Sequence, residues 1–207
     1  MQCALRLAVL FTAANGAAAQ DAAPRYVDQS TGLRFPTLLS QLRYEGLREF
    51  DKAALGYCVL YAAKDAHGQI CVYDFGHKNL PTGIDSAPFK DALRQAVDAT
   101  VAATNRAPLS KGELISTGTP SIEADGKVAK AEMRMLSSEM ALPEGGTSHQ
   151  VHLILMTTGF GKFIKLNYTA RNPESEAFAQ ETRQIVEEFI RFNGDTMKKL
   201  MVETKAP

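Results

Sequence analysis

Four histidines are the side chains of this sequence best suited to binding a metal ion or transferring a proton. His149 and His152 are three positions apart at the start of an expected strand, where alternation points their side chains to opposite faces. His67 lies in an expected turn, and His77 follows the end of a strand. We therefore expect solvated loop histidines rather than a metal site, and His67 and His77 would share an ion only if their loops converged.

Other short motifs that resemble catalytic sites lack the rest of their pattern. Residues 159–162, Gly-Phe-Gly-Lys, lead into a strand and lack the spacing of a phosphate-binding loop. Residues 74–76, Asp-Phe-Gly, occur without the other kinase motifs, and no Gly-x-Ser-x-Gly, Ser-x-x-Lys or Cys-x-x-Cys is present. Met133 and Met135 continue an alternating apolar face, which favours core packing over a copper site. The sequence predicts no catalytic residue, cofactor or metal, and an enzyme is the less favoured class.

Cys58 and Cys71 lie on two expected strands, over residues 55–63 and 69–75. A turn at residues 65–68 would place Cys71 four residues from the position opposite Cys58, which is about 13 Å along a strand. The Cα atoms of a disulfide usually lie within about 7 Å of each other. The sequence therefore favours two buried free thiols over a disulfide.

The N-terminus is typical of a cleavable export signal. A short basic start is followed by apolar residues 7–14 and by three alanines before Gln20. We expect cleavage after Ala19; retention as an anchor is the alternative, but a bilayer span needs about 20 apolar residues. Cleavage predicts a periplasmic or secreted protein with no stable membrane anchor.

Charge and length narrow the possible functional classes and the number of domains. The chain has 23 basic and 23 acidic residues and a formal net charge of zero, so it lacks the basic surface expected of a nucleic-acid-binding protein. Its length fits one domain. We expect a signal peptide over residues 1–19, a flexible lead over 20–31, a single domain over 32–194 and a weakly held C-terminal extension over 195–207.

Hydrophobic periodicity then predicts the elements that would hold any site. A first helix is expected after a cap at Ser86 and up to Asn105, and a second from a cap at Asn172 to a stop at Gly194. Alternation predicts strands over 33–35, 55–63, 69–75, 113–116, 128–136, 150–157 and 162–169. This order indicates an α+β fold, an antiparallel β-sheet with two main helices packed on it.

Over roughly residues 32–194, this element order resembles the PsbP-like α+β sandwich. The resemblance also rests on the strand end Tyr73-Asp74-Phe75-Gly76 and on the hairpin over residues 159–165. Exported bacterial proteins of unknown function have similar patterns. The resemblance implies an accessory protein that binds a larger partner and no shared catalytic site.

We therefore expect a non-enzymatic, exported binding or assembly-accessory domain with an unknown protein partner. Because loops on a rigid sheet commonly carry recognition, the candidate surface consists of Tyr73, Asp74, His77, Phe160 and Lys162. The alternative is a small-ligand carrier or a cryptic hydrolase, which would need an apolar pocket between the sheet and the helices.

Overall fold

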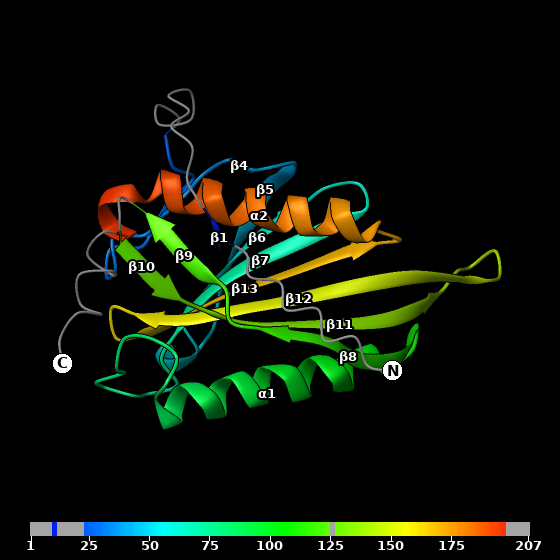
Figure 1. The fold of residues 1–207 in the computed structure, drawn as a ribbon, viewed down its shortest axis with the longest axis horizontal. Helices are drawn as coiled ribbons and strands as arrows, with labels where there is room; N and C mark the ends of the chain where they lie inside the picture. The colour runs from blue at the N-terminus through cyan, green and yellow to red at the C-terminus, as the bar shows by residue number, and fades with distance from the viewer. Residues whose placement is uncertain (1–9, 12–22, 125–126, 198–207) are drawn as a thin grey trace.

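The computed structural model describes residues 10–11, 23–124 and 127–197, and an eight-stranded antiparallel sheet is at its centre (Figure 1). The strand order is β4-β5-β6-β7-β13-β12-β11-β8. These strands are β4 (Leu38–Leu39), β5 (Leu42–Glu49), β6 (Tyr57–Ala62), β7 (Ala66–Tyr73), β8 (Leu109–Gly118), β11 (Glu132–Ala141), β12 (Thr147–Gly159) and β13 (Lys162–Arg171).

Short elements flank this sheet. β2 (Tyr26–Val27) pairs with β3 (Arg34–Phe35), and a short 3-10 helix, η1 (Ala53–Leu55), precedes β6. β9 (Ser121–Ala124) pairs with β10 (Lys127–Lys130) and, in parallel, with β1 (Leu10–Phe11). Most of the expected signal, residues 1–19, lies outside the described residues, as do Asp125 and Gly126. Cleavage after Ala19 would remove β1.

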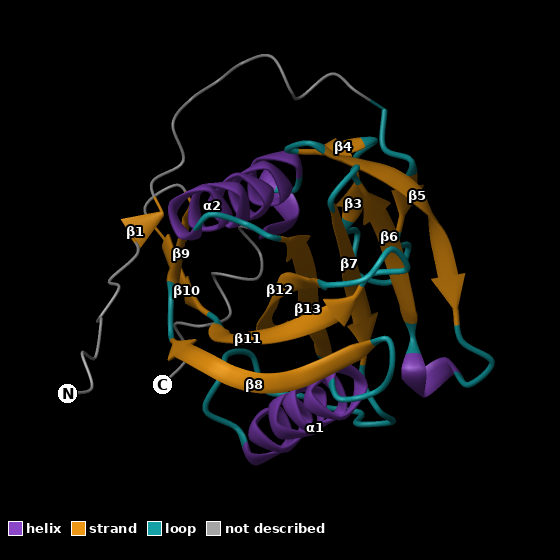
Figure 2. Cartoon of the chain, turned by 90° about the vertical axis from the view of Figure 1, so that its right-hand side faces the viewer, coloured by secondary structure: helices purple, strands orange, loops and turns teal. Residues whose placement is uncertain are grey.

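Two long helices, α1 (Ala87–Thr104) and α2 (Ser175–Phe192), cover opposite faces of the sheet (Figures 1 and 2). Val72 packs in the hydrophobic cluster that contains the buried side chains of α2, whereas the next residue, Tyr73, packs in the cluster that contains those of α1. Successive strand residues point to opposite faces, so each face has its own core. We call these clusters the α2-side core and the α1-side core. The structure confirms the predicted α+β class.

The starts of the two helices differ in how well the sequence predicted them. Ser86 caps α1 as expected, because its hydroxyl accepts a hydrogen bond from the Phe89 amide at 3.3 Å. Asn172 does not cap α2, so that prediction is wrong. It has φ +45°, and its side-chain carbonyl accepts a hydrogen bond from the His149 amide at 2.8 Å, which ties it to β12 instead. Glu174 occupies the N-cap position and makes no side-chain cap.

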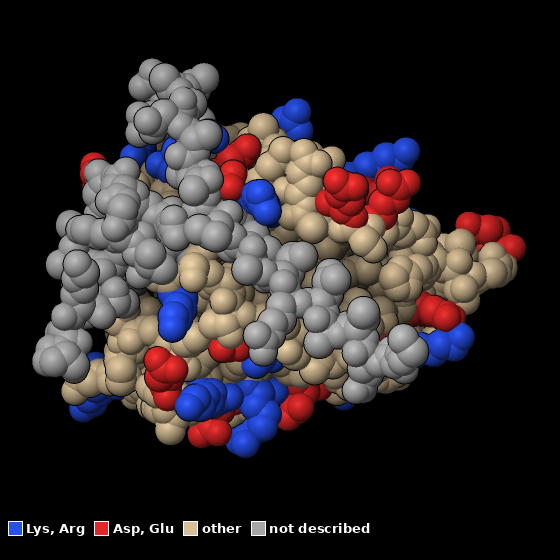
Figure 3. Space-filling model, viewed as in Figure 1, with Lys and Arg blue, Asp and Glu red and all other residues tan. Residues whose placement is uncertain are grey.

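Charged side chains of both signs occur on the face shown in Figure 3, in keeping with the zero net charge. On the face shown in Figure 3 neither sign forms a continuous patch, and the two are interspersed along the lower margin. No helix among residues 10–11, 23–124 and 127–197 is long and apolar enough to cross a membrane.

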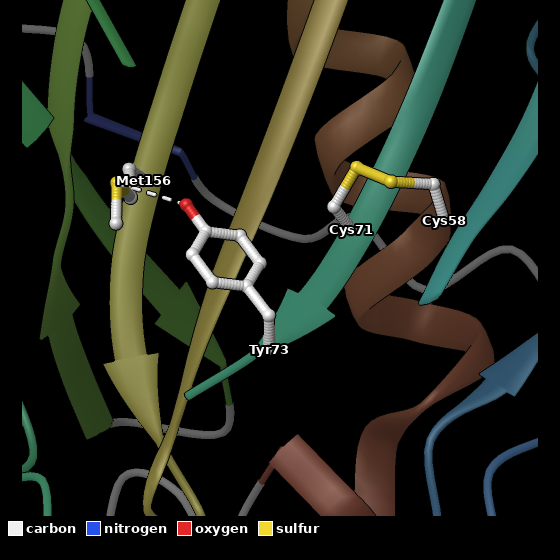
Figure 4. Close-up of a disulfide and its surroundings, with 4 residues drawn as sticks. All are labelled: Cys58, Cys71, Tyr73 and Met156. Carbon is white, nitrogen blue, oxygen red and sulfur yellow. Dashed lines mark hydrogen bonds between the residues drawn. A yellow bond between two sulfur atoms is a disulfide. The ribbon is translucent and has the colours of Figure 1, made fainter. Parts of the chain in front are cut away.

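Cys58 and Cys71 form a disulfide, which corrects the prediction of two free thiols (Figure 4). The turn between β6 and β7 is closed by a hydrogen bond from the Ala63 amide to the Ala66 carbonyl, two residues earlier than expected. Moving the turn by two residues changes the pairing register by four. Cys58 therefore lies directly opposite Cys71, with 4.0 Å between their Cα atoms.

Three boundaries also differ from the prediction. The expected flexible lead is paired from Tyr26 onward, because Asp28 holds the following turn by accepting hydrogen bonds from Ser30 and Thr31. The expected strand over 128–136 is interrupted at Ala131, which is buried between β10 and β11. In the expected C-terminal extension, Met197 is buried in the α2-side core; residues beyond it lie outside the described part.

Candidate partner-binding site

Two similar turns meet at one end of the sheet, and we call them the rim. One comprises residues 74–77 after β7, and the other comprises residues 159–162 between β12 and β13. Their central residues are Phe75 and Gly76 in the first and Phe160 and Gly161 in the second, with φ of +53°, +82°, +56° and +69°. Two consecutive positive φ values are typical of a type I′ turn. Each turn therefore places a phenylalanine where a small residue is usual.

An ion pair holds the two turns together. The Lys162 ammonium donates to the Asp74 carboxylate, and both side chains are partly shielded from solvent. The same carboxylate accepts the Gly76 amide at 2.7 Å. Burial raises the pKa of Asp74, but the hydrogen bonds from Lys162 and Gly76 and the nearby positive charges outweigh it, so the pKa lies below its ordinary value. The Asp74 carboxylate therefore stays ionised at neutral pH.

Aromatic rings cluster on the α1 side of the sheet next to these turns. The Phe75 ring lies 4.6 Å from Tyr73 and 5.9 Å from Phe163, and the Tyr73 and Phe163 centroids are 5.3 Å apart. The His77 ring meets the Phe163 ring edge-on at 6.2 Å. Tyr73 and Phe163 are buried, whereas Phe75 is 42% exposed. The cluster presents one large apolar side chain on a rigid aromatic base.

The backbone of Phe75 is fixed in an unfavourable conformation. Its amide donates to the carbonyl of Ala54 in η1 at 2.8 Å, and the Asp74 amide donates to the same carbonyl at 3.3 Å. A positive φ on a bulky residue costs roughly 1–2 kcal/mol and persists only where the surroundings enforce it. Such strain is concentrated at functional sites, so it marks Phe75 as the candidate anchor of this surface.

The five expected site residues do not form one surface. Asp74 and Lys162 touch, and exposed His77 lies beside them. Tyr73 is buried, and its hydroxyl donates to the Met156 sulfur at 4.0 Å, as the stick view in Figure 4 shows. Phe160 packs against the α2-side core, on the other face of the sheet. The structure therefore narrows the site to Asp74, His77 and Lys162 and adds Phe75.

Sequence reasoning missed a buried network around His152. Its Nε2 lies 2.8 Å from the Ser138 hydroxyl and its Nδ1 lies 3.0 Å from the Thr169 hydroxyl. A serine beside a histidine resembles a nucleophile and its base. However, Ser138 is only 2% exposed, and burial, with two nearby histidines, lowers the pKa of His152 to about 4. The network satisfies buried polar groups and has little capacity for base catalysis.

A metal site and a carrier pocket are the two other kinds of site that the sequence raised. Within residues 10–11, 23–124 and 127–197, no three His, Cys, Asp or Glu side chains gather as a metal site would require. An apolar cavity of about 60 Å³ lies between the sheet and α2, lined by residues such as Leu166, Phe189 and Met197. Ligand sites usually have about 300–1,000 Å³, so this cavity is too small for the apolar carrier pocket considered above.

Comparisons with known proteins find similar structures but no related sequence. No family model matches the chain, and no curated protein matches it. Among solved structures, it is similar to the solution structure of cyanobacterial PsbP (CyanoP) from Synechocystis sp. PCC 6803. The TM-score is 0.44 and the sequence identity is 15%, over 83% of this chain and 92% of that chain. This neighbour is of the PsbP type that the element order and the two short patterns resemble.

Proposed function

We propose that this chain is an exported, non-enzymatic binding domain of the assembly-accessory type, and that it contacts a protein partner through Phe75 at the rim. This proposal rests on Phe75, whose ring is exposed although its backbone has a positive φ that disfavours its residue type. Turn chemistry alone would favour asparagine or glycine at this position. Because the ring also stays 42% exposed, we infer that this phenylalanine serves a contact outside the chain.

The surroundings of Phe75 have the composition of an interface anchor. Aromatic residues contribute most to interface energies when they are rigid and lie beside polar groups that exclude water. Phe75 is held by Tyr73 and Phe163, and the Asp74 and Lys162 ion pair lies next to it. We expect a partner surface with an apolar pocket bordered by groups that hydrogen-bond to this ion pair.

Export is part of the proposal, and two features support it. Residues 1–19 have the pattern of a cleavable signal. Cys58 and Cys71 are paired, and structural disulfides persist in oxidising compartments outside the cytosol. We place the protein in the periplasm or outside the cell.

The proposal is tested by quantitative capture of partners from a native extract with three forms of the protein. Phe75→Asn removes the anchor but suits the positive φ, so the turn is retained. Phe160→Asn is the matched control, because it makes the same change in the same type of turn on the opposite face. Both variants are compared with the parent by thermal unfolding, so that a folding defect is recognised.

A protein that co-purifies in stoichiometric amounts with the parent and with F160N, but is depleted about tenfold or more with folded F75N, supports the proposal. If all three forms retain the partner equally, the binding site does not include Phe75. A stoichiometric small molecule without any protein would contradict the accessory function and favour the carrier alternative.

A further inference from the structure

α1 covers only part of its side of the sheet. It packs mainly against β8, β11 and β12, and Figure 2 shows it along β8, away from β5. The other end of the sheet consists of β5, β6, β7 and β13, which are neighbours in that order. These four strands therefore lie beyond the main contacts of α1.

One row of register partners crosses all four strands. It runs from Arg48 on β5 through Cys58 and Cys71 to Lys165 on β13. Register partners on adjacent strands point to the same side of a sheet, and both cysteines pack in the α1-side core. Arg48 and Lys165 therefore flank the disulfide on the α1 side. Three strand spacings of about 4.8 Å separate their backbones by about 14 Å.

Lys165 is a half-buried cation for which the chain supplies no anion. Its ammonium lies 5.6 Å from the centroid of the Tyr73 ring, and it has no ion pair among the described residues. Burial lowers the pKa of this ammonium, because the charged form loses hydration. A buried charge is costly unless an opposite charge or hydrogen bonds compensate it. Lys165 therefore has the surroundings of one half of an ion pair.

A second unsatisfied polar group lies beside Lys165. Asn167 is two positions further along β13, so it points to the same side of the sheet. Its side-chain oxygen is buried and has no hydrogen-bond partner. Nearly all buried polar atoms in native proteins are hydrogen-bonded, so each exception needs an explanation. A bound group that contacts Lys165 and Asn167 together would satisfy both side chains.

Positive charge dominates this part of the surface. Two further rows of register partners cross the same four strands at Leu60 and Ala62 of β6, and we call the three rows the basic face. The row at Ala62 begins with Arg43 on β5. Arg43 and Arg48 are exposed, and neither has an ion pair among the described residues. No position in the three rows is an aspartate or a glutamate, although the whole chain has equal numbers of acidic and basic residues.

We propose that the basic face binds an acidic segment of a protein partner. One carboxylate of that segment pairs with Lys165 and hydrogen-bonds to the Asn167 amide, and further carboxylates meet Arg48 and Arg43. Complementary charge of this kind speeds association and selects among partners more than it adds affinity. The basic face does not include Phe75, and this inference does not depend on the function proposed for the rim.

The arrangement favours a protein segment over other anions. Arg48 stacks on the Phe50 ring at 5.2 Å and Lys165 lies over Tyr73, so the two charges do not converge on one small anion. The headgroups of a flat membrane would meet the exposed arginines but not the half-buried lysine. Aspartate and glutamate side chains project from a polypeptide, so a single acidic segment can reach both the exposed and the half-buried groups.

The test is selection of a display library of random ten-residue linear peptides on the protein purified from cells that express the full chain. Selected peptides are then measured by fluorescence polarisation against the parent and the Lys165→Gln and Arg48→Gln variants. Arg25→Gln is the matched control, because Arg25 is also an exposed arginine on an aromatic ring, 5.7 Å from the Tyr44 centroid. Tyr44 packs against the α2-side core, so the control removes the same charge from the other face. Thermal unfolding identifies any variant that does not fold.

We expect the selected peptides to be rich in aspartate and glutamate and to bind the parent and R25Q alike. They should bind folded K165Q and R48Q at least about fivefold more weakly. Raising the NaCl concentration from about 50 to 200 mM should weaken binding to the parent, because salt screens the exposed charges.

The proposal is overturned if no peptide is enriched, if the enriched peptides are not acidic, or if K165Q or R48Q binds them as tightly as R25Q does. It is also overturned if vesicles of phosphatidylglycerol bind the parent and R25Q but not K165Q, since a lipid surface would then occupy the basic face. A concentration-dependent oligomer in sedimentation that K165Q abolishes would assign the basic face to a second copy of the chain instead.

Discussion

Replacing Cys58 and Cys71 together by alanine should lower the free energy of unfolding by about 3 kcal/mol. The disulfide links residues 13 positions apart, and closing a loop of roughly 15 residues in the unfolded chain is worth about 3 kcal/mol. The two residues lie directly opposite each other in the β6–β7 hairpin, so the hairpin register itself does not depend on the bond. The folded sheet should persist in the variant with reduced stability.

Urea unfolding followed by far-UV circular dichroism measures this difference, because the chain has no tryptophan and is rich in strands. With a slope of about 2 kcal/mol per molar urea, the midpoint should fall by roughly 1.5 M. A reductant should destabilise the parent similarly and leave the alanine variant unchanged. A difference below about 0.5 kcal/mol, or no additional thiols on reduction of the unfolded parent, would refute the pairing and the register behind it.

Three further predictions use the same unfolding assay. His152 has a pKa of about 4 in the folded state against an ordinary value near 6.5, so the unfolded state binds the proton first as the pH falls. The free energy of unfolding should therefore decrease by about 3 kcal/mol between pH 6.5 and pH 4. The H152Q variant should lose most of this pH dependence. Asn193→Ala should lower the free energy of unfolding by about 2–4 kcal/mol. The buried Asn193 side chain accepts a hydrogen bond from the backbone amide of Arg34 at 2.7 Å and donates one to the Arg34 backbone carbonyl at 2.8 Å. Gly56→Ala should abolish stable folding, since a Cβ there would lie 1.9 Å from the Val72 carbonyl oxygen; wild-type stability in any one of these would contradict the corresponding contact.

Local signals accounted for the elements that the sequence predicted well. The cap at Ser86 located the start of α1, because a capping side chain acts within one turn of its own helix. The turn between β12 and β13 lies in the hairpin expected over residues 159–165, because glycine marks positive φ in the sequence. The α+β class followed from the order of these elements. None of these inferences needed a contact between distant residues.

The errors arose where two local signals competed. A turn is possible at either end of residues 63–68, and Gly68 favours the later position. In the structure Gly68 lies within β7, where the Leu42 side chain approaches within 3.0 Å of the position a Cβ would occupy. A glycine that marks close packing has the same sequence signature as one that marks a turn. With the turn at the later position, Cys71 is four residues away from the position opposite Cys58, which is why the prediction of free thiols is wrong.

The candidate site shows a related limit. The predicted surface omits Phe75, although an aromatic residue before glycine at a strand end is itself an unusual turn. This pattern can be recognised from the sequence alone. The contact between Asp74 and Lys162 spans 88 positions, and it exists only because β13 pairs with β7 in one register. A one-residue slip would send each side chain to the opposite face, so which residues share the rim depends on strand pairing that no local pattern specifies.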